Sequence, residues 1–481
     1  MFEINKYVDL KGEYYIYGIT DIAALFYKKI VELYGSNSII GFLETKPTVK
    51  YYMGKRVFSP QEIEKDKVHF KIIIASAAHF KDMENTLKSC GILEEQIIVP
   101  YRVFDYFKTL YRKGKERDDI RRVCFWPPIN DNNQDLLRKI SWFIPDRMEV
   151  SVWCDNDKLE NQFNQNVHLE RSVDDKDRVF QEAEIIFLWR TNVDENEYIK
   201  YIDKIYVVDP YFYSYIETLN YHKIYYSSFS VSEKAAYREK SKKIFSELKR
   251  NAKKGVKARV FCSGPSIDEI HDNVYDDSIN IICNSMVKDK EWLERVKPYI
   301  LTFMDLNYFL SPTKYCEQFL QDVLEGQRLY DYYIVVCEHE VPLLLSHCPE
   351  LSGKVIGIAP DSDEYMWPDE QKLKVRGSEN IFTGMMIPLA SALCDEIEIA
   401  GCTGRNPDEN FYWKHSGRTQ YLDLMQTIFD MYPSVFRDQN YANYYEGHCQ
   451  RVEDLLEFGE KKGKKYKNIT TSYIPALAKR N

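Results

Sequence analysis

Two short segments, far apart in the chain, carry residue types suited to group transfer from a nucleotide. Residues 261–266 read Phe-Cys-Ser-Gly-Pro-Ser, an apolar stretch that runs into a turn of small residues. Such a turn lets backbone N–H groups approach a phosphate, and a following helix N-terminus favours an anion. Residues 444–448 read Tyr-Tyr-Glu-Gly-His, just ahead of a helical pattern at 449–458. An unperturbed imidazole titrates near neutral pH, so His448 is a candidate general base.

Further polar residues stand where apolar strands of the same C-terminal segment end. Asn284 and Asp305 each close a predicted strand, and Thr383 and Gly384 are predicted to form a turn that leads into a buried helix. Because parallel strands present their carboxyl ends at one edge of a sheet, ligand-binding groups should converge there. The predicted pocket contains Gly264, Ser266, Asn284 and Thr383.

Strands that alternate with helices must position these residues. This alternation predicts an α/β protein with several Rossmann-like parallel sheets in tandem. At 481 residues the chain exceeds one ordinary core, so we expect several domains. The predicted parts are a small domain at 1–105, a second at 120–228, a charged linker helix at 229–257 and a C-terminal catalytic domain at 258–481.

The two N-terminal domains show weaker signs of ligand binding. In the first, the turn after the strand ending at Gly18 lacks the second and third glycines of the dinucleotide fingerprint, which favours a scaffold or assembly role. In the second, residues 155–177 are polar enough to be mostly loop, and we expect a structural or acceptor-side role. Its strands are predicted at 122–126, 149–153, 184–189 and 204–209.

The helix predicted at 232–257 is rich in lysine and arginine. A solvated linker explains these charges. The alternative is weak attraction to an anionic membrane face or to a lipid-linked glycan, because clustered basic side chains favour anionic surfaces.

Composition excludes several classes of protein. A net charge of −9 argues against a nucleic-acid binder. No run approaches the about 18 apolar residues of a membrane span, and no secretory signal is visible, so we expect a cytoplasmic protein, with peripheral membrane contact as a further expectation. The 11 cysteines form no C-x-x-C pair. We therefore expect free thiols, no metal site and no required cofactor.

The order of the C-terminal motifs resembles the bacterial lipo-oligosaccharide sialyltransferases. The order is strand–Gly-Pro-Ser, Cys-Asn, Thr-Gly before a helix, strand–Gly, and Tyr-x-Gly-His before a Leu-Glu-Phe helix. It covers roughly residues 256–478, and related Gly-Pro-Ser domains occur in flagellin nonulosonate transferases and pterin pyrophosphokinases. The resemblance implies inverting transfer of a nonulosonic, sialic-acid-like sugar from a CMP-activated donor to a glycan, lipid-linked glycan or glycoprotein acceptor.

The resemblance also implies roles for single residues. His448 matches the family's proposed base, and Tyr445 lies close to it. Asn284 would hold the donor, while Thr383 and Gly384 match residues that contact the donor carboxylate or nucleotide. The implied donor site consists of Ser263, Gly264, Pro265, Ser266, Asn284, Asp305, Thr383, Gly384, Gly401, Arg405 and Tyr412.

The chain departs from the family pattern at several positions. Ser263 and Asp305 stand where the family has asparagines, and the segment after Gly401 lacks the tyrosines that assist the phosphate leaving group. Cations and phenols both donate to phosphate oxygens, so other residues could take over this task. The candidates are Arg405, Lys414 and Tyr412. His415 is a further candidate for the site, with a surface-loop histidine as the alternative.

Two other functions stay open at this point. A pyrophosphokinase-like enzyme on the same fold would need magnesium-binding carboxylates, for which Asp305, Asp361 and Asp363 are candidates. The other alternative is a non-catalytic assembly scaffold, and assembly as a homo-oligomer fits any of these functions. His448 likewise has a structural alternative, a histidine that caps the start of its helix.

Overall fold

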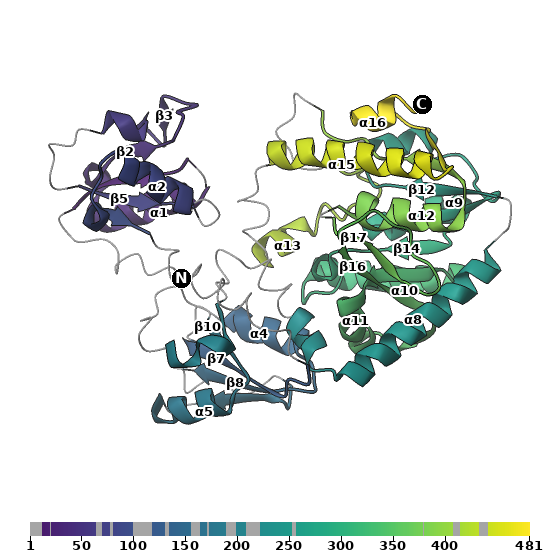
Figure 1. The fold of residues 1–481 in the computed structure, drawn as a ribbon, viewed down its shortest axis with the longest axis horizontal. Coiled ribbons are helices and arrows are strands. Elements are labelled where there is room, and N and C mark those ends of the chain that lie inside the picture. The colour runs from purple at the N-terminus through teal and green to yellow at the C-terminus, as the bar shows by residue number, and fades with distance from the viewer. Residues whose placement is uncertain are drawn as a thin grey trace. The chain divides into compact units, whose positions relative to one another are not determined.

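The structure is a computed structural model of the chain, in which two compact units are distinguished (Figure 1). One unit comprises Met1–Leu136, Met148–Glu217 and Pro433–Gln439, and the other comprises Leu137–Arg147, Thr218–Tyr432 and Asn440–Asn481. The structure describes residues 12–19, 21–63, 70–76, 80–99, 118–129, 134–154, 164–170, 173–188, 199–207, 222–252, 256–378, 380–406, 414–431 and 441–481.

The first sheet has the strand order β3-β4-β2-β1-β5-β6. All of its neighbouring pairs are parallel except β3 and β4, which are antiparallel. The apolar strands β1, β2 and β5 form its buried centre, as their sequences predict. Its elements are β1 (Glu13–Tyr17), α1 (Asp21–Tyr34), β2 (Ile39–Leu43), β3 (Tyr51–Tyr52), β4 (Lys55–Phe58), β5 (Phe70–Ile74), α2 (Phe80–Ser89) and β6 (Ile97–Ile98).

The second sheet has the order β11-β10-β7-β8-β9, and every pair in it is parallel. Trp126, Trp153 and Phe180 pack edge to face in a core on this sheet. Its elements are β7 (Arg122–Ile129), β8 (Glu149–Cys154), β9 (Val167–Glu170), α5 (Lys176–Glu182), β10 (Ile185–Leu188) and β11 (Ile205–Val207). Helix α4 (Gln134–Phe143), which lies between β7 and β8 in the sequence, belongs for the most part to the other unit.

The third sheet has eight strands in the order β17-β16-β15-β14-β13-β12-β18-β19, and all its pairs are parallel. The strands are β12 (Lys257–Phe261), β13 (Ser278–Cys283), β14 (Ile300–Thr302), β15 (Tyr333–Cys337), β16 (Val355–Ser362), β17 (Lys374–Arg376), β18 (Glu396–Ala400) and β19 (Lys465–Asn468). The helices are α8 (Val231–Asn251), α9 (Lys290–Val296), α10 (Lys314–Tyr330), α11 (Val341–His347), α12 (Ile387–Leu393), α13 (Met425–Met431), α15 (Tyr441–Lys461) and α16 (Pro475–Ala478).

The chain reverses its direction across this third sheet. It runs outward from β12 through β13, β14, β15 and β16, and then returns to place β18 on the other side of β12. Open parallel sheets bind ligands beyond the carboxyl ends of the strands at such a switch point. The α/β class with several mainly parallel sheets is therefore confirmed, and the edge at β12 and β18 is where a ligand site is expected.

Helix α8 is an integral part of the unit that contains the third sheet and ends at Asn481, which we call the C-terminal unit. We had expected a solvated linker. Ser230 caps it by accepting the Glu233 N–H, and the Glu233 carboxylate accepts the Ser230 N–H in return. The Ser241 hydroxyl accepts the Gly357 N–H of β16 at 3.0 Å, so the helix covers part of that strand. Its buried side chains include Ile244, Phe245 and Leu248.

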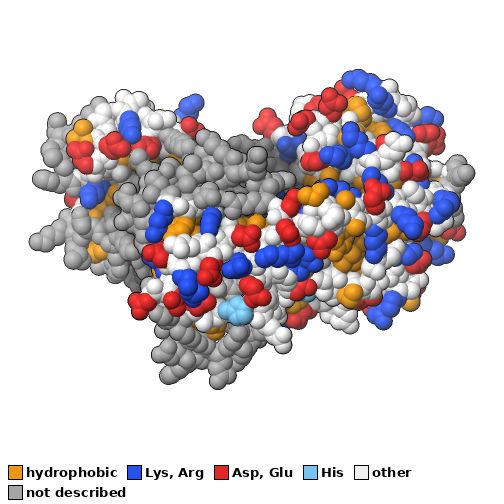
Figure 2. Space-filling view, turned by 60° about the horizontal axis from the view of Figure 1, so that its bottom comes forward, with side chains coloured by type: hydrophobic (Ala, Val, Ile, Leu, Met, Phe, Trp, Pro, Cys, Tyr) orange, Lys and Arg blue, Asp and Glu red, His pale blue; other side chains and the backbone are white. Residues whose placement is uncertain are grey.

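Several basic side chains of α8 are engaged in ion pairs. Arg238 pairs with Glu338 at 2.7 Å, and Lys249 pairs with Glu370 at 3.4 Å. On the face shown in Figure 2, basic and acidic side chains are interspersed. Part of the basic charge of this helix therefore serves local contacts with its own unit, which weakens the argument for attraction to a membrane.

Beyond β3 and β4 of the first sheet, three strands were not predicted from the sequence. β9 lies inside the segment that we expected to be mostly loop, and β17 and β19 are also additional. Each is the last strand at one edge of its sheet. Edge strands are commonly short and charged, which hides them from any search for apolar runs.

Candidate functional site

The ends of neighbouring strands bring several of the predicted residues to one edge of the third sheet. Phe261 of β12 is in register with Ile282 of β13 on one side. Ser263 and Asn284 each follow this pair by two residues, so they are neighbours where the strands end. On the other side, Phe261 is in register with Ala400 of β18, and Gly401 comes next.

The turn after β12 packs tightly against the turn after β18. The Gly264 N–H donates to the Gly401 carbonyl oxygen at 2.9 Å. A Cβ at Gly264 would lie 2.5 Å from that oxygen and 2.6 Å from the Thr403 hydroxyl. Gly401 has φ +69, and a Cβ there would overlap the Cys262 carbonyl oxygen. Glycine is required at both positions because no side chain fits between the two turns.

The Gly-Pro-Ser turn does not present the free amides that we expected for a phosphate cradle. The Ser266 N–H donates to the Thr403 hydroxyl at 2.9 Å, and the two hydroxyls lie 2.8 Å apart. The Ser266 hydroxyl also lies 3.3 Å from that of Thr470, and Pro265 has no N–H to offer. Buried polar groups need partners, and Ser266 is 5% exposed. The cradle prediction is wrong for this conformation, because its donors are satisfied internally.

Asn284 is held in a strained backbone conformation directly after β13. Its φ of 49 lies in the left-handed region, which asparagine tolerates better than most residues. Its side chain is half-buried and forms no hydrogen bond to the described part of the chain. Such strain is common at ligand sites, where a fixed geometry is useful. Asn284 therefore has an amide group to offer to a ligand.

Asp305 lies beyond β14, beside an acidic and histidine-rich group that the sequence analysis did not single out. Glu340 is fully buried, and its carboxylate accepts the N–H groups of Leu306 at 3.1 Å and Cys337 at 3.2 Å. Burial, together with the nearby Asp305, raises the pKa of Glu340. The Nδ1 atom of His222 is 3.9 Å from the Glu340 carboxylate, and burial lowers the pKa of His222 to about 3.

A sequence signal for this group existed. Glu338, His339 and Glu340 follow the apolar strand β15 directly, at its carboxyl end. His222, in contrast, lies in a distant helical segment at 222–227, and only the fold brings it to Glu340. In the ranges that the structure describes, no three His, Cys, Asp or Glu side chains form a group that could hold a metal ion.

Thr383 and Gly384 lie within a helix and not in the turn that we expected. A π-helical turn, Phe382–Met386, leads directly into α12. A Cβ at Gly384 would be 2.6 Å from the Met304 sulfur, which places this turn beside the end of β14. The Thr383 and Ser378 hydroxyls are 2.6 Å apart. π-turns are frequent at functional sites. Among the described residues, the hydrogen bonds of the Thr383 hydroxyl go to Ser378 and Asn380 and none goes to Ser266.

Tyr445 and His448 lie inside α15, which begins before the predicted start of the helix. The helix passes through Gly447, and buried residues further along it supply the packing that offsets the low helix propensity of glycine. His448 therefore does not cap the helix start. The Tyr445 hydroxyl would lie 2.8 Å from a Cβ at Gly404. This contact joins α15 to the turn after β18.

His448 is more deeply buried than a general base in an open cleft would be. Its side chain is 1% exposed, and burial with the nearby Arg451 charge lowers the pKa of His448 to about 4. The imidazole is therefore neutral at physiological pH, and it is a weak base. A substrate would have to reach it through a rearrangement of its surroundings.

His415 is also brought to this edge. Its Nδ1 atom lies 2.7 Å from the Ser263 hydroxyl. The Ser416 N–H donates to the Ser263 carbonyl oxygen at 2.9 Å, which holds the 414–420 segment against the Gly-Pro-Ser turn. Lys414 begins the same segment, while Tyr412 lies outside the described residues.

The carboxylates considered for magnesium lie elsewhere. Asp361 is at the exposed end of β16, where it pairs with Lys374 at 2.8 Å, and Asp363 follows it. In the described part of the chain, these carboxylates belong to no group of three or more side chains that could hold a metal ion. The carboxylate set required for the pyrophosphokinase alternative is thus not assembled by the residues that we named for it.

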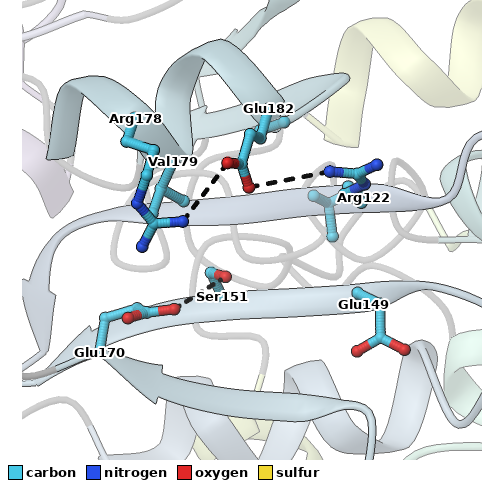
Figure 3. Close-up of a pocket in the computed structure, with 9 residues that line it drawn as sticks. Arg122, Glu149, Ser151, Glu170, Arg178, Val179 and Glu182 are labelled. Atoms are coloured by element: carbon cyan, nitrogen blue, oxygen red, sulfur yellow. Dashed lines mark hydrogen bonds and ion pairs between the residues drawn. The ribbon is translucent and has the colours of Figure 1, made fainter. Parts of the chain in front are cut away.

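A cavity of about 80 Å³ lies in the second sheet, at the end where β7 and β8 begin (Figure 3). Three of its charged side chains pair with one another. Glu182 lies 3.4 Å from Arg178 and 3.7 Å from Arg122. Parallel sheets bind ligands at the opposite, carboxyl edge. This cavity is therefore a weaker candidate than the edge of the third sheet.

Within the described residues, no helix is both long enough and apolar enough to cross a membrane. A scan against protein-family models, a search of curated proteins and a search of solved structures each returned no match to this chain.

Proposed function

We propose that the C-terminal unit is a glycosyltransferase. It would move a nonulosonic, sialic-acid-like sugar from a CMP-activated donor to a glycan acceptor, with inversion at the anomeric carbon. The single observation that carries this proposal is the assembly at the switch point of the third sheet. There the glycine turns at Gly264 and Gly401 interlock, Asn284 is strained beside them, and Tyr445 contacts the second turn.

Binding of the donor at this edge agrees with the chemistry of the residues present. Asn284 has an amide group that can both donate to and accept from a nucleotide. The interlocked turns supply a rigid wall, because neither glycine leaves space for movement. The Tyr445 hydroxyl, packed against Gly404, fixes the position of α15 relative to the turn after β18. Rigid positioning is what a transferase needs to align donor and acceptor.

The reaction requires one proton acceptor. The acceptor hydroxyl oxygen attacks the anomeric carbon, the bond from that carbon to the phosphate oxygen breaks, and its electron pair leaves with CMP. The hydroxyl proton passes to a base, the role that we propose for His448. Its low pKa keeps the imidazole neutral, while its 1% exposure means that the acceptor must open the site.

The two N-terminal sheets lie outside the proposed chemistry. The turn at Gly18 is packed internally, since the Gly18 N–H donates to the Leu43 carbonyl oxygen at 2.8 Å. We propose a scaffold or acceptor-side role for these parts, in a cytoplasmic protein.

A thermal-shift panel on the full chain tests the proposal. CMP, CDP, UDP, ADP and ATP are each added, with and without magnesium. A ligand that binds only the folded state raises the melting temperature, and at 100 times its Kd it adds about 2.7 kcal/mol of stability. We expect CMP to give the largest shift, with no need for magnesium, and Asn284→Ala to reduce it. A magnesium-dependent response to ATP alone would favour the pyrophosphokinase alternative.

A further inference from the structure

The residues 414–421 form a strap across the turn after β12. At its start, the His415 Nδ1 lies 2.7 Å from the Ser263 hydroxyl. The next residue, Ser416, donates its N–H to the Ser263 carbonyl oxygen at 2.9 Å and its hydroxyl to Asp268 at 2.7 Å. The strap is thus bound to both sides of the Gly-Pro-Ser turn.

The far end of the strap is fixed as firmly. The Lys288 ammonium donates to the carbonyl oxygens of Gly417 at 3.1 Å and Gln420 at 2.6 Å. The Tyr315 hydroxyl of α10 donates to the Gln420 side chain at 2.6 Å. Anchors on three separate elements hold the imidazole of His415 in one place, which is the requirement for a binding group with defined geometry.

The second ring nitrogen of His415, Nε2, has no hydrogen-bond partner in the described structure. The Nδ1 atom faces Ser263, and the described structure contains no hydrogen bond from Nε2. The direction of the hydrogen bond between Nδ1 and the Ser263 hydroxyl depends on the tautomer of the ring. When the Ser263 hydroxyl donates to Nδ1, the proton of the neutral ring lies on Nε2. Burial lowers the pKa of His415, with the Ser263 backbone acting in the opposite direction, and the ring therefore stays neutral.

The phosphate of a donor at this edge needs hydrogen-bond donors, and the Gly-Pro-Ser turn has none to spare. The Gly264 and Ser266 N–H groups are bonded to Gly401 and Thr403. Among the described residues around this turn, His415 and Asn284 offer polar groups without internal partners. An N–H group directed at a phosphate oxygen stabilises the charge that develops as the sugar leaves.

We propose that His415 binds the phosphate of the nucleotide donor through Nε2–H, and that Ser263 is the positioning residue that fixes this tautomer. This inference rests on the proposed function. When the bond from sugar to phosphate breaks, the electron pair stays on the phosphate oxygen, which accepts the hydrogen bond from Nε2. No proton is transferred from His415, since the acceptor's proton goes to His448.

The test compares a ligand that has the phosphate with one that lacks it. Titration calorimetry measures CMP and cytidine binding to wild type, His415→Phe, His415→Gln and Ser263→Ala. His415→Phe should weaken CMP by about 10- to 100-fold, the effect of a lost hydrogen bond to a charged group, and leave cytidine unchanged. His415→Gln should keep most of the affinity, because its amide can donate from a similar position. His168→Phe, in the second sheet, is the control and should change neither.

A second measurement reports the tautomer directly. Nitrogen-15 NMR of labelled histidine should show His415 protonated at Nε2 in wild type, and a mixture of tautomers in Ser263→Ala. This experiment also decides the matter if His415→Phe does not fold.

The outcomes separate the two proposals. If wild type binds neither CMP nor cytidine, the proposed function fails. If wild type binds CMP and His415→Phe binds it equally well, or loses CMP and cytidine in equal measure, the role of His415 is overturned while the proposed function stands. Protonation of His415 at Nδ1 in wild type would also overturn it.

Discussion

The first and third sheets each have a glycine turn packed closely against a neighbouring strand end, but only the turn in the third sheet has polar side chains beside it that lack internal partners among the described residues. In both, the central strand ends at a glycine turn that lies against a neighbouring strand end. The Gly18 N–H donates to the Leu43 carbonyl oxygen at 2.8 Å, and the Gly264 N–H donates to the Gly401 carbonyl oxygen at 2.9 Å. Near Gly18 the polar side chains pair with each other, as Tyr17 and Thr45 do at 2.6 Å.

The third sheet differs in the side chains that stand beside its glycines. Ser263, Asn284 and His415 meet at one edge, and two of them retain polar atoms without described partners. A glycine turn at the end of a parallel strand is therefore not a sign of phosphate binding, since close packing alone requires it. What indicates a ligand site is the neighbouring polar groups that have no hydrogen-bond partner within the described structure.

The largest effect should come from His448. His448→Ala should lower turnover by about 100- to 10,000-fold, the range for loss of a general base, and leave CMP affinity nearly unchanged. Steady-state kinetics with calorimetric CMP binding measures both quantities. His168→Ala serves as the control outside the third sheet. Full turnover together with a lower melting temperature would show that His448 only fills the core under α15.

Acid should destabilise the third sheet through its buried histidines. Burial lowers the pKa of His448 to about 4 and that of His222 to about 3, from the ordinary value of 6.5. At pH values between the ordinary pKa and the lowered one, the unfolded chain binds protons that the folded chain does not. The free energy of unfolding is therefore highest above pH 6.5, and it falls by about 3 kcal/mol for each histidine as the pH drops toward 4.

Pulse proteolysis in urea at pH 7.5 and pH 5.0, with peptides mapped by mass spectrometry, measures this loss by region. His222→Phe should flatten the dependence for the third sheet, because a neutral ring of similar size removes one of the titrating groups. An equal acid response in wild type and in this variant would contradict the prediction.

Replacing the glycine of each turn by alanine should lower the free energy of unfolding by different amounts. Gly401→Ala should lower the free energy of unfolding by about 2–4 kcal/mol, since the new Cβ overlaps the Cys262 carbonyl oxygen at a left-handed φ. Gly18→Ala also strains the backbone, at a φ of +121, but it should be milder because the nearest neighbour of its Cβ, the Ala75 carbonyl oxygen, is 3.3 Å away. Chemical denaturation gives both values, and Gly18→Ala should leave CMP binding unchanged. A smaller effect at Gly401 than at Gly18 would show that the turn after β18 can shift.

The smallest effect should come from Asn284. Asn284→Ala should weaken CMP by about tenfold at most, the value of one hydrogen bond, and lower stability by about 1 kcal/mol because alanine resists a left-handed φ. Asn284→Gly is the matched variant, which relieves the strain but also lacks the amide. Calorimetry and urea unfolding should therefore separate affinity from stability. Wild-type CMP affinity in both variants would remove Asn284 from the donor site.

Much of the fold was predictable because central strands are apolar and bounded by turn residues. The predicted strands at 333–337 and 396–400 coincide with β15 and β18, and Asn284 and Asp305 do follow β13 and β14. The edge strand β19 was missed, since its Lys-Tyr-Lys-Asn sequence has little apolar character. Local patterns report burial, and edge strands are only partly buried.

The sequence by itself determined the α/β class, the central strands and the polar residues at their carboxyl ends, since apolar periodicity and turn chemistry are local properties. Only the tertiary structure decided how those residues are used. Ser266 is satisfied by Thr403 and Thr470, which are 137 and 204 residues away along the chain. His415 reaches Ser263 across 152 residues. Hydrogen-bond partners at such separations depend on strand order and register, which no local pattern contains.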